Sequence, residues 1–164
     1  QIAIYQEMLK SLETQIKEIE KEMLQMVKNS SRLRAVFDLI ISIPGVGPKL
    51  ALCLIAELPD LKCFKSPKQL VAFLGLNPSV RESGSSVRSR GSISYAGSRL
   101  IRKMLYMPAM SAMRYNPMIK AFADRLNERG KNGKVIVVAC MRKLAHIIYG
   151  VLKHGVGFIG TYSV

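Results

Sequence analysis

Ile43-Pro44-Gly45-Val46-Gly47-Pro48-Lys49-Leu50-Ala51 lies between two apolar stretches whose hydrophobic residues recur at helical spacing. The glycines permit a tight turn, and Pro48 suits the first turn of a helix that follows it. The segment therefore predicts a helix-hairpin-helix over about residues 33–57. The amides that open the second helix would face outward and could bind a phosphate, with Lys49 nearby. Gly45, Gly47 and Lys49 are thus candidate nucleic-acid-binding residues; a hairpin whose glycines serve packing alone is the alternative.

Outward from the hairpin, helical spacing recurs and no convincing strand alternation appears. Ser66-Pro67-Lys68-Gln69 predicts a capping box that opens a helix, and Gly75 would end that helix. Further helices are expected over about 97–115, 117–129 and 133–153, and Asn116-Pro117 would begin the second of these. Met104, Met107, Met110 and Met113 recur every three residues and are typical of a core or a subunit contact. The polar stretch 77–95 is expected to be a long loop without fixed structure in the absence of nucleic acid.

Residues 1–31 have a heptad pattern of their own. Their apolar positions alternate in steps of three and four, as the a and d sites of a coiled coil do: Ile2, Tyr5, Leu9, Leu12, Ile16, Ile19, Met23 and Met26. The segment predicts a coiled-coil or linker helix that joins copies of the chain through residues 2–26 into a dimer or tetramer. An amphipathic helix packed on its own domain is the alternative. The predicted fold class is all-α, with this helix followed over 32–164 by a helical domain that contains the hairpin and a long Ser/Gly/Arg-rich loop.

The charge points to a polyanionic partner. The chain has 164 residues, with 25 Lys and Arg against 11 Asp and Glu, and a net charge of +14. Since residues 1–31 hold four lysines against five glutamates, the positive excess lies beyond them. A hydrophobic content of 49 % excludes wholesale disorder, and no apolar run is long enough to predict a membrane span. Nucleic acid is therefore the expected partner, before a membrane surface. The first residue is Gln, which suggests a piece of a longer protein.

Cysteine and histidine spacing predicts no metal site in this chain. Cys53, Cys63 and Cys140 form no CxxC pair and are expected to be reduced residues in or near a core. His146 and His154 lie eight residues apart without a metal-ligand motif.

The loop 81–94 is the stretch richest in candidate chemistry. Serine hydroxyls next to glycine and arginine could support phosphoryl transfer, because a hydroxyl can attack phosphorus while guanidinium groups neutralise the developing charge. Arg81, Arg88 and Arg90 precede Arg99, Arg102 and Lys103, which would share one face of the next helix. Lys131 and Lys134 flank a basic helix-entry turn that could meet a phosphate. No residue stands at a spacing that identifies a general base, so the chemistry alone favours a nucleic-acid-contacting loop over a nucleophilic serine.

Several segments in order resemble a known family: IPGVGPKLA at 43–51, SPKQLVAFLGLNP at 66–78, ESGSSVRSRGSISYAG at 82–97, LIRKMLYMPAMSAMRYNP at 100–117 and GKNGKVIVVACMRKLAHIIYGVLKHG at 130–155. The family is the C-terminal transposase domain of bacterial DEDD-type insertion-sequence transposases, relatives of the pilin-gene DNA invertases. The resemblance covers the chain from about residue 32, and the heptads before it resemble the coiled-coil linker of that family.

The resemblance implies a specific chemistry. The family joins this helical domain to an N-terminal RuvC-like domain with four metal-binding acidic residues. It implies that Ser83, in the S-G motif, is the nucleophile that becomes joined to DNA, and that some members use a bridge RNA as a guide. Mg²⁺ would belong to the RuvC-like domain, since only Glu82, Asp124 and Glu128 follow residue 60 here. This chain would then be inactive alone and would work in the bacterial cytoplasm, associated with the nucleoid.

Two other functions remain in view. A helix-hairpin-helix module that only docks nucleic acid predicts that Ser83 is dispensable. A DNA glycosylase built around the hairpin would need a catalytic acid beyond it, for which Asp60 is the candidate. One departure from the resembling family is Tyr95, where lysine is common, so a phosphate contact there is in doubt.

Overall fold

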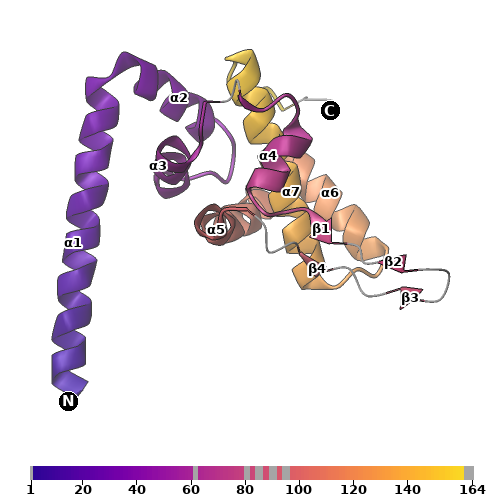
Figure 1. The fold of residues 1–164 in the computed structure, drawn as a ribbon, viewed down its shortest axis with the longest axis horizontal. Helices are drawn as coiled ribbons and strands as arrows, with labels where there is room; N and C mark the ends of the chain where they lie inside the picture. Colours follow the sequence, from indigo (N-terminus) through magenta and orange to yellow (C-terminus); the bar gives the residue numbers. More distant parts are fainter. Residues whose placement is uncertain are drawn as a thin grey trace.

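The computed structural model of the protein describes residues 2–60, 63–79, 82–83, 87–88, 92–93 and 97–160. Within these residues it contains seven α-helices (Figure 1), as the all-α prediction requires. Their bounds are α1 Ile2–Asn29, α2 Ser31–Ile41, α3 Pro48–Glu57, α4 Pro67–Phe73, α5 Arg99–Tyr115, α6 Pro117–Glu128 and α7 Gly133–His154.

Helix α7 forms the centre of the molecule. It packs against α2, α4, α5 and α6, and α5 also packs against α3. Ten of its 22 residues are buried, including Leu144, Ile147 and Ile148. Among the described helices, α7 alone is long and apolar enough to cross a membrane by length and composition. That apolar character matches its place in the core, where it is surrounded by four other helices.

Helices α2 and α3 lie over the segment for which a helix-hairpin-helix is predicted. Ser30 separates α1 from α2 and caps α2, because its hydroxyl accepts a hydrogen bond from the amide of Leu33 at 3.4 Å. Pro48 is the first residue of α3 and Gly47 is its N-cap. Ile43 and Val46 of the connection are buried, so the hairpin contributes to the core. Two helices therefore lie where the sequence predicts them, and the first begins two residues before the predicted start at 33.

The N-termini of α6 and α4 differ in how they are capped. Asn116 begins α6 as predicted, since its Oδ1 accepts hydrogen bonds from the amides of Met118 and Ile119 at 3.1 and 3.3 Å. The capping box predicted at Ser66 is not formed, because the Ser66 side chain makes no capping hydrogen bond. Gln69 reaches back instead to the amide of Lys65, whose N–H donates to Oε1 at 2.7 Å. Gly75, at φ +68°, ends the α4 turn as expected.

The stretch expected to be a loop without fixed structure contains paired strands. Pro78–Ser79 (β1) pairs antiparallel with Ser92–Ile93 (β4), and Glu82–Ser83 (β2) pairs with Val87–Arg88 (β3). The sequence prediction missed this ribbon because two-residue strands carry no alternation to detect. At its base, the amide of Ser98 donates to the carbonyl of Phe73 at 2.8 Å. A Cβ on Gly97, which has φ +101°, would contact the backbone of Phe73 and Gly75. The two ends of the ribbon are thus fixed side by side.

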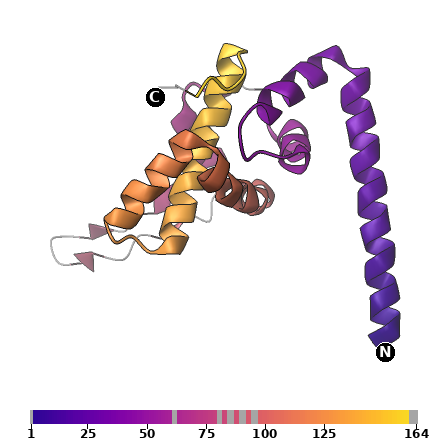
Figure 2. The same ribbon diagram turned by 180° about the vertical axis from the view of Figure 1, so that it is seen from behind.

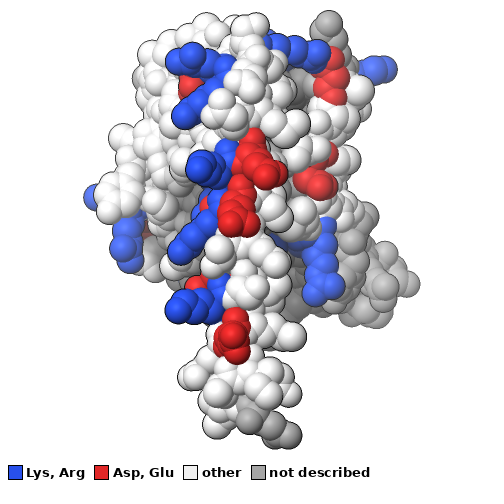
Figure 3. Space-filling view, turned by 90° about the vertical axis from the view of Figure 1, so that its left-hand side faces the viewer, with Lys and Arg blue, Asp and Glu red and all other residues white. Residues whose placement is uncertain are grey.

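Helix α1 is an arm that stands apart from the helical body (Figures 1 and 2). It packs against α2 and α3 near its C-terminal end, and only Val27 of its residues is buried. Leu9, Leu12, Ile16 and Ile19 of the heptad are about half exposed or more. In Figure 3 the arm faces the viewer, and the acidic and basic side chains of the arm lie next to uncharged surface. Within this chain, therefore, the helix does not pack its apolar stripe on its own domain.

Candidate nucleic-acid interface

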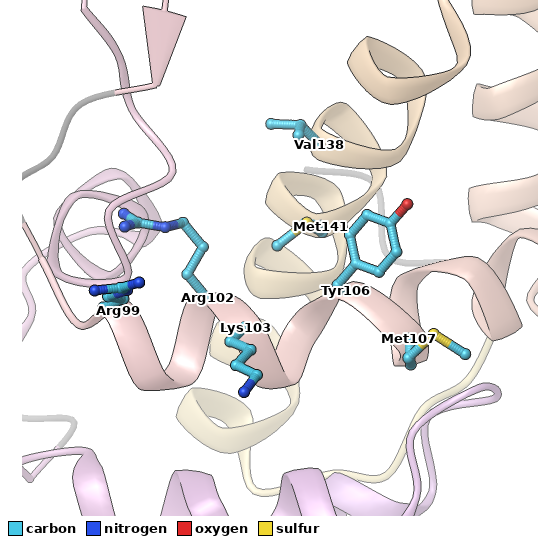
Figure 4. Close-up of a pocket in the computed structure, with 7 residues that line it drawn as sticks. All are labelled: Arg99, Arg102, Lys103, Tyr106, Met107, Val138 and Met141. Atoms are coloured by element: carbon cyan, nitrogen blue, oxygen red, sulfur yellow. The ribbon is translucent and has the colours of Figure 1, made fainter.

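A basic groove lies between α5 and α7. It has a volume of about 580 Å³ and is lined by Arg99, Arg102, Lys103, Tyr106, Met107, Val138 and Met141 (Figure 4). The first five come from α5 and the last two from α7. Figure 4 shows the two guanidinium groups at one end and Met107 at the other. The three cations predicted to share a face of this helix are therefore brought together.

A second groove lies between α5 and the hairpin. Its volume is about 560 Å³, and its lining includes Gly45, Gly47 and Lys49 together with Lys103, Met107 and Pro108. Because Lys103 and Met107 line both grooves, the two form one continuous surface along α5. We call this surface the α5 groove. It unites the hairpin candidates with the candidates of the following helix, which the sequence separates by some fifty residues.

The residue pattern of α5 explains why one side of it stays open. Ile101, Leu105, Ala109 and Ala112 recur at helical spacing and are fully buried. The opposite side carries Arg99, Lys103 and Met107, and Met107 is 67 % exposed. The four periodic methionines accordingly divide: Met104 and Met113 pack against the core, whereas Met107 and Met110 are exposed. The predicted core role therefore holds for Met104 and Met113. Met107 and Met110 lie on the surface, where the predicted contact with another subunit stays a prediction.

The two helices that form the first groove, α5 and α7, carry no acidic residues. Arg99 and Lys103 make no ion pair with any residue that the structure describes. Arg102 also has a structural contact, because its Nη1 donates to the carbonyl of Gly75 at 3.1 Å. The guanidinium group of Arg102 therefore ties the groove to the base of the ribbon.

The two hairpin glycines differ in their surroundings. Gly45 has φ +95°, and a Cβ there would lie 2.5 Å from Cα of Ala112, so its packing against α5 requires glycine. A Cβ on Gly47 would meet nothing within 4 Å. The packing alternative thus accounts for Gly45 but not for Gly47, at which phosphate binding stays a prediction.

Lys49 is engaged by the arm. Its Nζ lies 2.7 Å from Oε1 of Glu20 in α1. The lysine side chain is 67 % exposed, so this ion pair is largely solvated and contributes little to stability. This pairing could not be predicted from the sequence, because Glu20 lies in a heptad segment that contains both acidic and basic residues. A phosphate at the hairpin would compete with the carboxylate of Glu20 for Lys49.

The remaining candidates lie at two other places. Lys131 and Lys134 are both exposed at the start of α7, and Lys134 lies one helical turn before Val138 of the α5 groove. Ser83 and Arg88 belong to β2 and β3, and the structure describes their backbone only. Arg81 and Arg90 lie outside the described residues, as does Tyr95. The ribbon that carries Ser83 leaves the helical body at Asn77 and returns at Gly97, next to Arg99 and Arg102.

The cysteines and acids provide no metal site within the described part of the chain. No group of three or more His, Cys, Asp or Glu lies together there. All three cysteines are free; Cys140 is buried and Cys53 half-buried, but Cys63 is exposed, so its expected place near a core is wrong. Burial raises the pKa of the Cys140 thiol to about 11. Asp60, the candidate acid of the glycosylase alternative, pairs with Arg32 at 3.7 Å on the surface.

Sequence reasoning missed the uncharged wall of the α5 groove. Tyr106 of α5 lines the groove together with Val138 and Met141 of α7, and these side chains add apolar surface beside the cations. The sequence offered one indication, a tyrosine in the midst of the methionine repeat, but core and surface methionines cannot be separated without the neighbouring helix.

Comparison with known proteins identifies the family of this chain. Residues 37–124, just over half of the chain, match the family described as "Transposase IS116/IS110/IS902 family". The pilin gene-inverting protein of Moraxella bovis is 34 % identical over 140 residues, which cover 84 % of this chain and 43 % of that protein. The transposase for insertion sequence element IS1111A of Coxiella burnetii is 34 % identical over 119 residues, which cover 68 % of this chain and 31 % of that protein. The chain thus spans less than half the length of these relatives. It belongs to the IS116/IS110/IS902 transposase family.

Proposed function

We propose that this chain is the DNA-binding and nucleophile-bearing part of a transposase or recombinase. The observation that carries the proposal is the α5 groove, where Arg99 and Lys103, which make no ion pair with the described residues, lie beside the base of the ribbon that contains Ser83. The family match and the transposase and gene-inverting relatives support DNA as the substrate. A structured guide RNA is the second polyanion that the proposal includes. The helical body over 32–164 would supply this interface, and the arm over 1–31 would supply assembly.

In the proposed reaction, Oγ of Ser83 attacks a phosphodiester of DNA. The new Oγ–P bond forms as the bond from phosphorus to one sugar oxygen breaks, and the attacking hydroxyl loses its proton to a base that lies outside the residues assigned here. Arg81, Arg88 and Arg90 would hold the phosphate oxygens and reduce the cost of the charge that develops on them. The cations of the α5 groove would hold the flanking duplex by its backbone.

Mg²⁺ belongs to this proposal only through sequence outside the chain. The described residues contain no acidic cluster that fits a divalent ion. We therefore assign Mg²⁺ to the RuvC-like domain that the resembling family carries.

The nucleophile is tested in the full-length transposase. Ser83→Ala should abolish the covalent protein–DNA complex that denaturing gels detect, while duplex binding stays within about twofold. Ser85→Ala, in the same segment, is the matched control and should leave the complex intact. Undiminished covalent attachment by Ser83→Ala would overturn the serine assignment and favour the docking-only helix-hairpin-helix module.

The interface is tested separately, by duplex binding to the 164-residue chain. Arg99→Gln/Lys103→Gln should weaken binding and reduce the slope of log K against log salt concentration by about 2, since each neutralised phosphate contributes about 0.9. Lys120→Gln/Arg125→Gln changes the same charge on exposed positions of α6 and should behave as wild type. Equal behaviour of the two double variants would exclude the α5 groove as the DNA site.

Self-association through residues 2–26 is the remaining part of the proposal. The half-exposed heptad positions of α1 need a partner, and a second copy of the same helix presents a matching stripe. Leu9→Lys/Ile16→Lys should convert the dimer or tetramer into a monomer in sedimentation experiments without loss of helicity in the body. Lys10→Ala/Lys17→Ala, on the polar flank, should leave the mass unchanged. A wild-type chain that sediments as a monomer at micromolar concentration would contradict this assignment.

A further inference from the structure

A second basic surface follows the partly exposed edge of α7. Most of this helix is buried, but Val138, Arg142, His146 and Gly150 are partly exposed and recur every four residues. Lys143 lies beside them, and Lys153 follows at the exposed end of the helix. The edge is therefore a ridge of the i, i+4 type, and its polar members are all basic or titratable.

Helix α4 adds a further cation to this edge. Because α4 packs directly on α7, its exposed Lys68 lies close to the same imidazole as Arg142 and Lys143. Burial lowers the pKa of His146, and the positive charges of Arg142, Lys143 and Lys68 lower it further. Nε2 of His146 is buried without a hydrogen-bond partner, which also favours the neutral ring. Two cations of α7 and one of α4 thus act on a single imidazole at the partly exposed edge of the central helix.

Nothing in the described part of the chain neutralises this group. The sequence contains no Asp or Glu after Glu128, and α4 contains none. No ion pair among the described residues involves Lys68, Arg142 or Lys143. Gathering like charges in this way costs free energy in the isolated chain, and an anionic ligand at the surface would offset that cost.

The edge is continuous with the α5 groove. Val138 lines that groove, and Arg142 lies one helical turn further along the same ridge. Lys134 lies one turn before Val138, so the basic edge runs from Lys134 to Lys153. At 1.5 Å per residue this is roughly 30 Å. A duplex turn is about 34 Å, so the edge is nearly as long as one helical turn of DNA measured along its axis.

We propose that Lys68, Arg142, Lys143 and His146, which we call the α7 strip, form a second binding site for DNA phosphates and extend the footprint of the α5 groove. This inference rests on the proposed function, because the DNA in the α5 groove is what the strip would continue to hold. The strip reads the backbone and carries no base specificity, since it presents cations on a helix edge and no side chain set for base edges.

The first test measures salt dependence with a 30-base-pair duplex by fluorescence anisotropy. Lys68→Gln/Arg142→Gln/Lys143→Gln should reduce the slope of log K against log salt by about 2–3. Lys120→Gln/Arg125→Gln/Arg129→Gln, on α6 and at its C-cap, removes the same charge from exposed positions and should leave the slope unchanged. Circular dichroism establishes that each variant is folded.

The second test needs no substitution and uses the two histidines of the chain. A phosphate beside the strip should raise the pKa of His146, because an anion favours the charged imidazolium. Proton NMR titration should therefore show a higher pKa for His146 in saturating duplex than in free protein. The signal of His154, the other histidine of the chain, is followed in the same spectra. An unchanged His146 in the complex would overturn the proposal even where the triple variant fails to fold.

The outcomes separate this inference from the proposed function. If Arg99→Gln/Lys103→Gln weakens duplex binding while the strip variant matches its α6 control, the strip is wrong and the α5 groove stands. If neither variant differs from its control, both assignments fail. If the strip variant loses affinity for a structured RNA of equal length but keeps its affinity for the duplex, the DNA assignment is overturned in favour of RNA.

Discussion

Substitution of Gly45 by alanine should destabilise the hairpin strongly. Its φ of +95° is unfavourable for any residue with a Cβ, at a cost of about 1–2 kcal/mol. The new Cβ would also lie 2.5 Å from both Cα and N of Ala112, in the fully buried centre of α5. Overpacking of a core typically costs about 1–3 kcal/mol, so we expect a loss of about 2–5 kcal/mol in the free energy of unfolding. At a slope of about 2 kcal/mol/M, the urea midpoint falls by about 1–2.5 M.

Gly47→Ala is the matched control for this prediction. Gly47 has φ −104°, and a Cβ there meets nothing within 4 Å. Its urea midpoint should therefore change by no more than the equivalent of about 1 kcal/mol, the size of the N-cap effect. Ala112→Gly should not rescue Gly45→Ala, because the backbone atoms of Ala112 cause the closest contacts. If the two glycine variants unfold at the same urea concentration, the hairpin does not pack on α5 as described.

Three further predictions concern groups away from the hairpin. Asn116→Ala should lower stability by about 1–2 kcal/mol in thermal unfolding, because Oδ1 of this buried residue caps two amides of α6, and Asn116→Ser should recover part of the loss. The pKa of His146 is lowered in the folded chain, so the unfolded chain binds the extra proton first as the pH falls. The free energy of unfolding should therefore decrease as the pH drops below 6.5 and level off below the pKa of the folded chain. This pH dependence should weaken in His146→Gln. In thiol labelling near pH 8, Cys63 should react at once and Cys140 only on unfolding, since the latter is buried and its pKa is about 11; equal rates would refute this assignment.

The helices could be predicted from the sequence because their starts and ends carry local signals. Pro48, Asn116-Pro117 and Gly75 act through backbone geometry and hydrogen bonds within a few residues, so their effect does not depend on the rest of the fold. The exception, Ser66, shows the limit of such signals: the box residues are present, but Gln69 bonds to Lys65 instead.

The site was predicted less completely, because its assembly depends on contacts between distant segments. The positive charges of the hairpin and of α5 were identified, but the sequence does not indicate that Lys103 lines a groove with both Lys49 and Val138. Nor does it indicate that Glu20 reaches Lys49 from the arm. Such pairings depend on how α1, α3, α5 and α7 cross, which no local pattern encodes. The role of Ser83 rests on the family resemblance rather than on geometry.

The contacts that hold the two ends of the ribbon together have a consequence for sequence variation. Since the amide of Ser98 bonds to Phe73 and Gly97 packs against Gly75, the segment between them is a closed loop on a rigid base. Doubling the length of such a loop costs only about 0.6 kcal/mol of closure entropy. The helical body can therefore tolerate large changes in the residues between Asn77 and Gly97. Its stability and the chemistry carried by the ribbon can then change independently, so that the loop can be exchanged or lengthened without redesign of the core.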